Sequence, residues 1–135
     1  MKDFLKIRDM NPLHEDIKVY AVRCRLSRGR KISGGELREF AGQLMSSIAV
    51  SCIKQGAKVI GHIKAYLEHD TGFLHAHTVG EPGDVTIEGT DGSPADRFTV
   101  VINSVVYGLA AEAVKGATES TLESLRIQFG FLREP

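Results

Sequence analysis

Histidines are the side chains of this sequence best suited to chemistry, and four of the five lie close together. They occur within residues 59–79, VIGHIKAYLEHDTGFLHAHTV, a pattern that predicts two β-strands folded back on each other around residues 69–72. His75 and His77 are two residues apart, so on a strand their imidazoles project from the same face. Imidazoles at this spacing can chelate one metal ion when a third ligand approaches from a neighbouring strand.

The pairing register of this hairpin decides which third ligand is within reach. If Glu68 pairs with Phe73, the histidines of the second strand share one face with alternate residues of the first strand. A zinc- or cobalt-type divalent metal is then chemically sensible, with His69 as a further neighbour. The candidate ligands are His62, Glu68, His75 and His77. A slip of one residue moves the second strand's histidines to the opposite face, and the sequence does not choose between the two registers.

Two other interpretations of the histidines stay open. In the first register Lys64 lies opposite His77, and its ammonium group repels a cation, which weighs against a metal. The plainer interpretation is a set of exposed or interface histidines on an open sheet. A subunit interface that responds to protonation is the third, because the unperturbed pKa of histidine lies near neutral pH.

Residues 27–35, SRGRKISGG, predict a basic, glycine-containing loop that leads into a helix. Backbone amides and the helix dipole favour an anion at such a helix start, so phosphate or a nucleotide is a candidate ligand. The residues that would bind it are Arg28, Arg30, Lys31, Gly34 and Gly35. The segment matches neither GxxxxGK[ST] nor GxGxxG, and a solvated loop with an ordinary helix cap is the plainer interpretation. Aromatic residues are not interleaved with the basic ones, so nucleic acid is not favoured as a partner.

Nucleophilic catalysis has little support in the sequence. There is no GxSxG motif, and the serines at positions 46, 47 and 51 fall within a predicted helix without an evident base. Cys52 lies on the apolar stripe of that helix, where a thiol is expected to be inert. The sequence therefore favours a non-catalytic protein, while leaving open an enzyme whose site is assembled only by folding.

Bulk composition predicts one soluble domain spanning residues 1–135. Hydrophobic residues make up 42% and charged residues 25%, and 17 basic side chains balance 17 acidic ones. Global charge therefore gives no reason to expect a nucleic-acid or membrane partner. No apolar run is long enough to span a bilayer, and Cys24 and Cys52 have no ligand spacing. We expect a cytoplasmic protein with reduced thiols.

Hydrophobic periodicity predicts the elements that position these candidates. Ser33 and Glu36 form a capping box at the start of one helix, and Gly56 ends it. A second capping box, Ser120 with Glu123, is expected within the last helix. The predicted elements are an N-terminal arm at 1–14, strands at 16–26, 84–88 and 97–107, the histidine hairpin, helices at 33–56 and 118–129, and a C-terminal tail at 130–135.

This order predicts an α+β two-layer sandwich, in which two helices cover one face of a mostly antiparallel sheet of four to five strands. The stretch 97–107 is apolar nearly throughout and is expected in the sheet interior, and the strand at 16–26 is expected to be either central or covered on both faces. The other face of the sheet is left open, and several apolar or aromatic side chains point to it. Such faces are commonly closed by a second subunit, so we expect a homo-oligomer.

Residues 58–125 resemble the C-terminal domain of CobW-type GTPases, the metal-chaperone family linked to cobalamin and zinc. The likeness lies in the order and character of four segments, which are VIGHIKAYLE, LHAHTVG, RFTVVINSVVYGL and TLESLRIQF. The chain contains no P-loop and no Cys-x-Cys-Cys motif, so neither GTP hydrolysis nor the family's metal site is carried over. The resemblance implies a free-standing accessory domain that docks a partner or hands over a metal or corrinoid cofactor.

Overall fold

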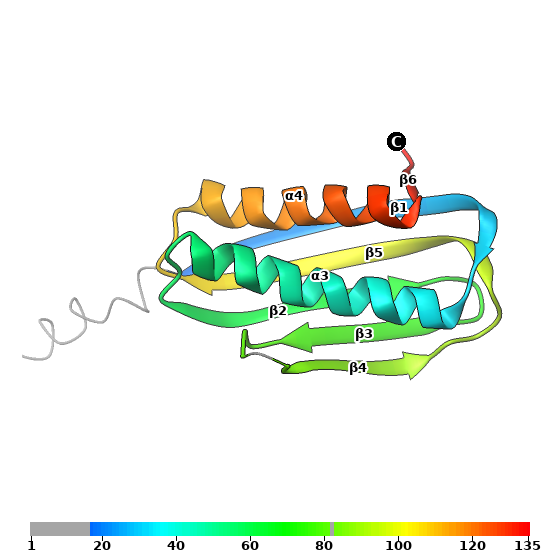
Figure 1. Cartoon of the computed structure of the whole chain (residues 1–135), viewed down its shortest axis with the longest axis horizontal. Coiled ribbons are helices and arrows are strands. Elements are labelled where there is room, and N and C mark those ends of the chain that lie inside the picture. The colour runs from blue at the N-terminus through cyan, green and yellow to red at the C-terminus, as the bar shows by residue number, and fades with distance from the viewer. Residues whose placement is uncertain (1–16, 82) are drawn as a thin grey trace, which may run out of the picture.

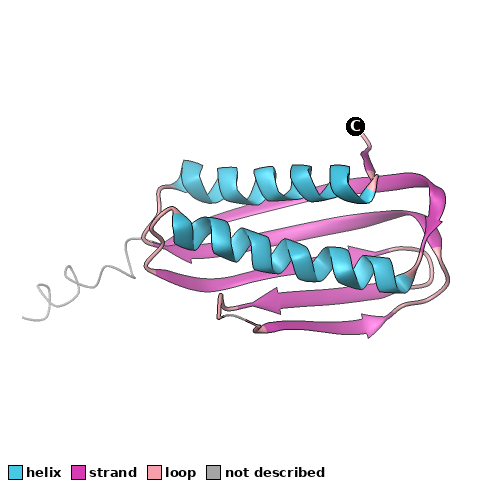
Figure 2. Cartoon of the chain, viewed as in Figure 1, coloured by secondary structure: helices cyan, strands magenta, loops and turns pink. Residues whose placement is uncertain are grey.

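The fold is an α+β two-layer sandwich, seen in a computed structural model that describes residues 17–81 and 83–135 (Figure 1). Within these described residues, a six-stranded antiparallel sheet forms one layer and two helices form the other, and both helices lie on the same face of the sheet (Figure 2). The predicted N-terminal arm, residues 1–14, lies outside the described residues. In chain order the elements are β1 (Ile17–Ile32), α3 (Gly34–Lys54), β2 (Val59–Glu68), β3 (Phe73–Thr78), β4 (Val85–Thr90), β5 (Ala95–Tyr107), α4 (Ala111–Phe129) and β6 (Leu132–Arg133).

The sheet has the strand order β4-β3-β2-β5-β1-β6. The near-continuous apolar strand β5 lies between β2 and β1, which confirms its predicted interior position. Among the described residues, β1 has only the two-residue β6 as its other neighbour, so it is not a central strand. Val19 is 61% exposed, because no helix or strand of residues 17–81 and 83–135 covers the helix-free face of β1, so β1 is not covered on both faces either.

Helix α3 begins as the sequence predicts. The Ser33 hydroxyl accepts from the Glu36 amide while the Glu36 carboxylate accepts from the Ser33 amide, so two otherwise orphaned donors are satisfied. One face of the helix is buried against the sheet. Its buried residues are Leu37, Phe40, Ala41, Leu44, Met45, Ile48, Ala49 and Cys52.

Helix α4 begins earlier than predicted. It starts at Ala111, and its N-cap residue Ala110 makes no side-chain capping bond, so the expected capping box of Ser120 and Glu123 does not form. Residues 108–116, which the sequence alone assigns neither to a helix start nor to a connection, are thus mostly helix. A buried hydroxyl contact fixes α4 to the sheet, since Ser104 Oγ and Thr118 Oγ1 are 2.8 Å apart.

Residues 130–135 were predicted to be a tail, but part of this segment lies in the hydrophobic core. Gly130 takes a left-handed conformation (φ 77°) that ends α4, and the next side chain, Phe131, is buried. Phe131 makes edge-on contacts with Phe40 and Phe98, with ring centroids 5.0 and 5.2 Å apart. Residues 132–133 then pair with β1 as β6, which raises the strand count above the predicted four to five.

A β-bulge at Gly61 changes which residues of β2 face the helices. The sequence predicts Val59 on the helix side, yet Val59 is 45% exposed and Ile60 is buried. The register shifts between Ile60 and His62, and the extra residue reverses the alternation of faces at that point. A Cβ at Gly61 would lie 2.7 Å from the Tyr107 ring, so only glycine fits the bulge.

No helix among the described residues is long and apolar enough to cross a bilayer.

Candidate functional site

The histidine hairpin adopts the first of the two registers considered above. Glu68 pairs with Phe73, Tyr66 with His75 and Lys64 with His77. Because directly paired residues of antiparallel strands point to the same side, these side chains share the helix-free face. The predicted candidates His62, Glu68, His75 and His77 are therefore all on one surface.

We call this helix-free surface of the sheet the open face. Pairing across all the strands assigns its members, and most of them are half-exposed or exposed. Its central residues are Val19, Ala21 and Arg23 of β1, Val101, Asn103 and Val105 of β5, His62, Lys64 and Tyr66 of β2, Phe73, His75 and His77 of β3, and Glu88 of β4.

An aromatic column crosses the hairpin on the open face. The Tyr66 and His75 rings are stacked, with centroids 4.5 Å apart and planes only 2° from parallel. Phe73 and His77 extend the column on either side, at 6.1 Å from Tyr66 and 5.3 Å from His75. Stacked rings of this kind expose a flat, partly apolar edge that suits contact with another protein surface.

The electrostatics of the open face favour neutral histidines. Burial lowers the pKa of His75, and the nearby His77 and Lys64 lower it further, while Glu88 opposes them. Burial and Lys64 likewise lower the pKa of His62. The His75 Nε2 atom is buried and finds no hydrogen-bond partner among residues 17–81 and 83–135. The ring is thus held by stacking and leaves one polar atom unused.

The four predicted metal ligands share a surface without converging on one point. Within the part of the chain that the structure describes, no three or more His, Cys, Asp or Glu side chains are placed to hold one ion. His75 and His77 are neighbours, whereas His62 and Glu68 lie at different positions along β2.

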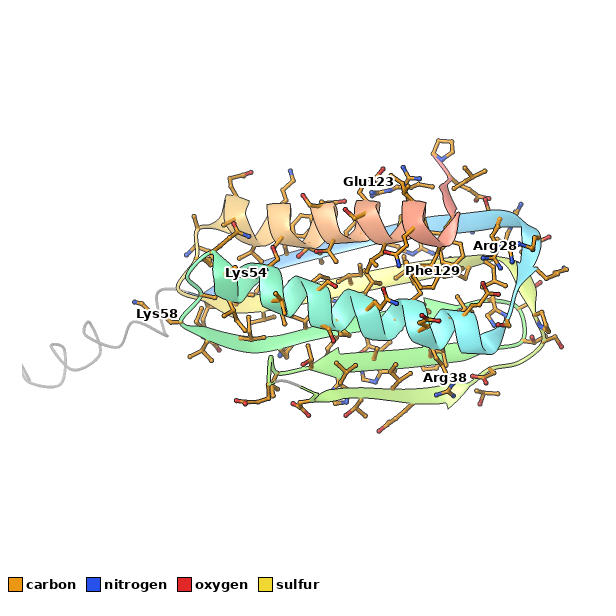
Figure 3. All side chains as sticks on the ribbon, in the orientation of Figure 1. Arg28, Arg38, Lys54, Lys58, Glu123 and Phe129 are labelled. Atoms are coloured by element: carbon orange, nitrogen blue, oxygen red, sulfur yellow. The ribbon has the colours of Figure 1, made fainter. Side chains whose placement is uncertain are left out.

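The basic segment at 27–35 is not the predicted loop, because β1 continues through it to Ile32. Arg28 points into the molecule instead of into solvent, with a side chain only 7% exposed. Its guanidinium donates to the carbonyl oxygens of Arg30, Lys31 and Phe129 and pairs with the Glu36 carboxylate at 2.9 Å. Figure 3 shows Arg28 beside Phe129, where α4 ends and α3 begins. The Arg28 side chain therefore links β1 to both helices and has a structural role.

The helix start beside it is already occupied by the protein's own acidic groups. A Cβ added at Gly34 would lie 2.6 Å from the Asp91 side chain, so Asp91 sits directly against this turn. Asp91 also forms an ion pair with Arg38 at 2.7 Å. Pairing with Arg28 and Ser33 lowers the pKa of Glu36 to about 2, which keeps it charged at the helix start. Arg30 and Lys31 remain on the surface, and Lys31 lies 3.9 Å from Asp96.

The two thiols offer no activated nucleophile. Burial raises the pKa of Cys52 on α3 and of Cys24 on β1, so both favour the protonated form.

The sequence did not predict a cavity that the structure shows beside β1. A hollow of about 500 Å³ lies at the junction of β1 and β6, and arginines from both strands line it, namely Arg23, Arg25 and Arg133. Alternate arginines on β1 were a visible signal. Their partner Arg133 lies in a segment predicted to be a tail, so the cluster could be recognised only once β6 was placed beside β1.

Comparison with known proteins gives matches among solved structures. No family model and no curated protein matches the chain. Solved structures do match, among them a Zn(II)-bound triple mutant of the YjiA GTPase (TM-score 0.44) and Zn(II)-bound YjiA from E. coli (TM-score 0.37), each 12% identical. Each match covers 78% of this chain and 30% of that one, so the chain spans less than a third of YjiA.

Proposed function

We propose that this chain is a non-catalytic interaction protein that works as a homodimer, with the open faces of two copies packed against each other. The observation that carries the proposal is the open face itself. It presents half-exposed valines and the aromatic column of β2 and β3, and none of the described residues covers it. The sequence resemblance suggests an accessory role beside a metal- or corrinoid-handling system.

The size of the open face suits a second copy of the chain. Five strands spaced about 4.8 Å apart, along up to roughly 34 Å of β5, give it an area of roughly 700 Å². Stable protein interfaces bury about 800 Å² on each partner. A net charge of zero also means that two copies do not repel each other.

The charges of the open face are complementary under a two-fold rotation. One row across the sheet reads Arg23, Val101, Tyr66, His75 and Glu88. A two-fold axis parallel to the strands and passing over β2 reverses this row in the second copy. Arg23 of one copy then meets Glu88 of the other, and the apolar and aromatic residues meet in the centre.

Light scattering coupled to size-exclusion chromatography tests the dimer. We expect twice the 14.7 kDa chain mass for the natural protein, and the single mass for Val105→Lys. Val50→Lys is the matched control, since Val50 is exposed on the outer side of α3 and should leave the dimer intact. Arg23→Glu should weaken the dimer, and Glu88→Arg in the same chain should restore it. A natural protein that is monomeric at every concentration would refute the proposal.

A metal site on His75 and His77 is the second candidate. Two observations favour it, the 5.3 Å separation of the two rings and the unpartnered Nε2 atom of His75. Neutral imidazole is the form that binds a metal, and the lowered pKa of His75 favours that form. Titration with zinc or cobalt in a calorimeter should give stoichiometric binding that His75→Ala and His77→Ala each remove and His69→Ala retains. Equal heats for all variants would rule the site out.

A further inference from the structure

Among residues 17–81 and 83–135, the outer edge of β1 is unpaired along most of its length. Strand β6 pairs only with Leu26 and Ser27, and the Glu134 amide donates to the Arg25 carbonyl. Among the described residues, no strand pairs with the outer edge of residues 17–24. Figure 1 shows the short β6 beside one end of the long β1. Eight residues of strand backbone therefore lack a neighbour on this side.

The direction of the free backbone groups follows from the pairing with β6. The Arg25 carbonyl points outward to Glu134, and backbone groups alternate in direction along a strand. The amide and carbonyl groups of Val19, Ala21 and Arg23 therefore also point outward. Residues 17–24, IKVYAVRC, contain no proline, glycine or bulge that would block a further strand. Unpaired edges of this kind bind extended peptides by strand addition.

The arginine-lined cavity indicates that such a peptide should carry an acidic side chain. It lies where β6 stops, in line with the free edge, and Arg23, Arg25 and Arg133 line it. Arg25 is 3.8 Å from Glu134, and Arg133 is 3.1 Å from Glu119. Arg23 has no hydrogen-bond or ion-pair partner among the described residues. A carboxylate on a bound segment would give Arg23 the partner that it lacks among these residues.

We propose that the free edge of β1 binds an extended segment of a partner protein that carries an acidic side chain. The segment adds to the sheet as a strand in line with β6, with its backbone on Val19, Ala21 and Arg23. Its acidic side chain enters the cavity beside Arg23 and Arg25. Side chains on the same face as Val19 and Ala21 are apolar or small, because they lie against an apolar part of the sheet.

This edge site goes beyond the proposed dimer and does not require it. Both proposals use the Arg23 side chain, so the charge test of the edge site below is made at Arg25, which the dimer contact does not use. A strand added at the edge lies in the plane of the sheet, whereas the second copy packs on the open face. Each proposal can therefore be refuted without the other, since the mass of the protein in solution tests the dimer and peptide binding tests the edge site.

The test pans the full chain against a displayed library of random peptides of about ten residues, enough to span residues 17–24. We expect enriched peptides to share an acidic residue within an extended, β-prone pattern. Amide hydrogen exchange with a bound peptide should then slow at Ala21 and Arg23. Enrichment of no peptide, or protection confined to β2 and β3, would overturn the proposal.

Point variants separate backbone pairing from charge. Ala21→Pro removes an outward amide and leaves the ladder to β5 intact, so peptide affinity should fall roughly tenfold or more. Ala21→Ser keeps the amide and should change affinity by less than about threefold. Arg25→Glu should weaken acidic peptides roughly tenfold, while Arg30→Glu, the same charge change on β1 away from the cavity, should not. Melting temperatures confirm that each variant folds, and equal affinity for Ala21→Pro and Ala21→Ser would contradict strand addition.

Discussion

The two faces of strand β5 are built from alternate residues of the same stretch, yet they differ in almost every property. The face toward the helices carries Phe98, Val100, Ile102, Ser104 and Val106, all of which are buried. The open face carries Arg97, Thr99, Val101, Asn103 and Val105, which are exposed or half-exposed. The contrast shows that one side of the strand packs into the core and stabilises the fold, while the other side provides the residues that can bind a partner.

A similar division holds for the charged residues of β1. Arg28 lies on the helix side, where its donors join β1, α3 and α4. Arg23 and Arg25 lie on the open side and are exposed. A buried guanidinium needs all its partners, whereas an exposed one is free to meet a ligand or a second copy.

The largest expected effect comes from truncating the covered face. Ile102→Ala should lower the free energy of unfolding by about 3 kcal/mol, because it leaves a cavity between the sheet and the helices. Val101→Ala, one residue away on the open face, should cost about 1 kcal/mol or less. Urea unfolding of the two variants measures the difference. Equal losses would mean that the open face is as tightly packed as the covered one.

Arg28→Met should come next, with a loss of about 2–3 kcal/mol. The substitution keeps much of the buried side-chain volume, but it leaves the carbonyl oxygens that Arg28 served without a donor. Arg30→Met, two residues along on the surface, should change stability by less than about 0.5 kcal/mol. A small loss for Arg28→Met in urea unfolding would contradict its role in joining the helices.

Acid should weaken the same junction through Glu36. Its pKa of about 2 in the folded protein lies below the ordinary 4.5, so its contribution is fully present above about pH 4.5 and is lost as the pH falls toward 2. Glu36→Gln should therefore flatten the dependence of melting temperature on pH in this window. Glu112→Gln, in the first turn of α4, is the control and should retain the slope.

The histidines of the open face should make the free energy of unfolding depend on pH at a higher pH than Glu36 does, and by a smaller amount. The lowered pKa values of His62 and His75 mean that the unfolded chain binds protons more readily than the folded one. Stability should therefore decline as the pH falls through the ordinary histidine pKa of about 6.5 and should be retained above it. The double variant His62→Gln, His75→Gln should reduce this decline in a melting-temperature series. An unchanged slope would show that neither histidine causes it.

Local signals predicted much of the covered side correctly. The Ser33–Glu36 box and the apolar stripe of α3 were readable because capping and helical periodicity involve residues close in sequence. The bulge at Gly61 was not, because glycine in a strand has several uses and only the neighbouring Tyr107 ring shows which one applies.

The candidate site was predicted in part. For one of the two possible registers, the sequence correctly predicted which hairpin residues share a surface. It did not choose the register, because that depends on pairing with β5 and β4 as well as on the turn. The role of Arg28 could not be predicted, because its partner Phe129 is 101 residues away. The same holds for the arginine cluster, which needs β6 beside β1.

The sequence by itself determined the α+β class, helix α3 with its cap, and the presence of a histidine hairpin, since each follows from periodicity and neighbouring residues. Tertiary structure alone decided the register, the inward turn of Arg28 and the free edge of β1. The physical reason is that burial and strand pairing join residues distant in sequence, and a one-residue change in pairing exchanges the two faces of a strand.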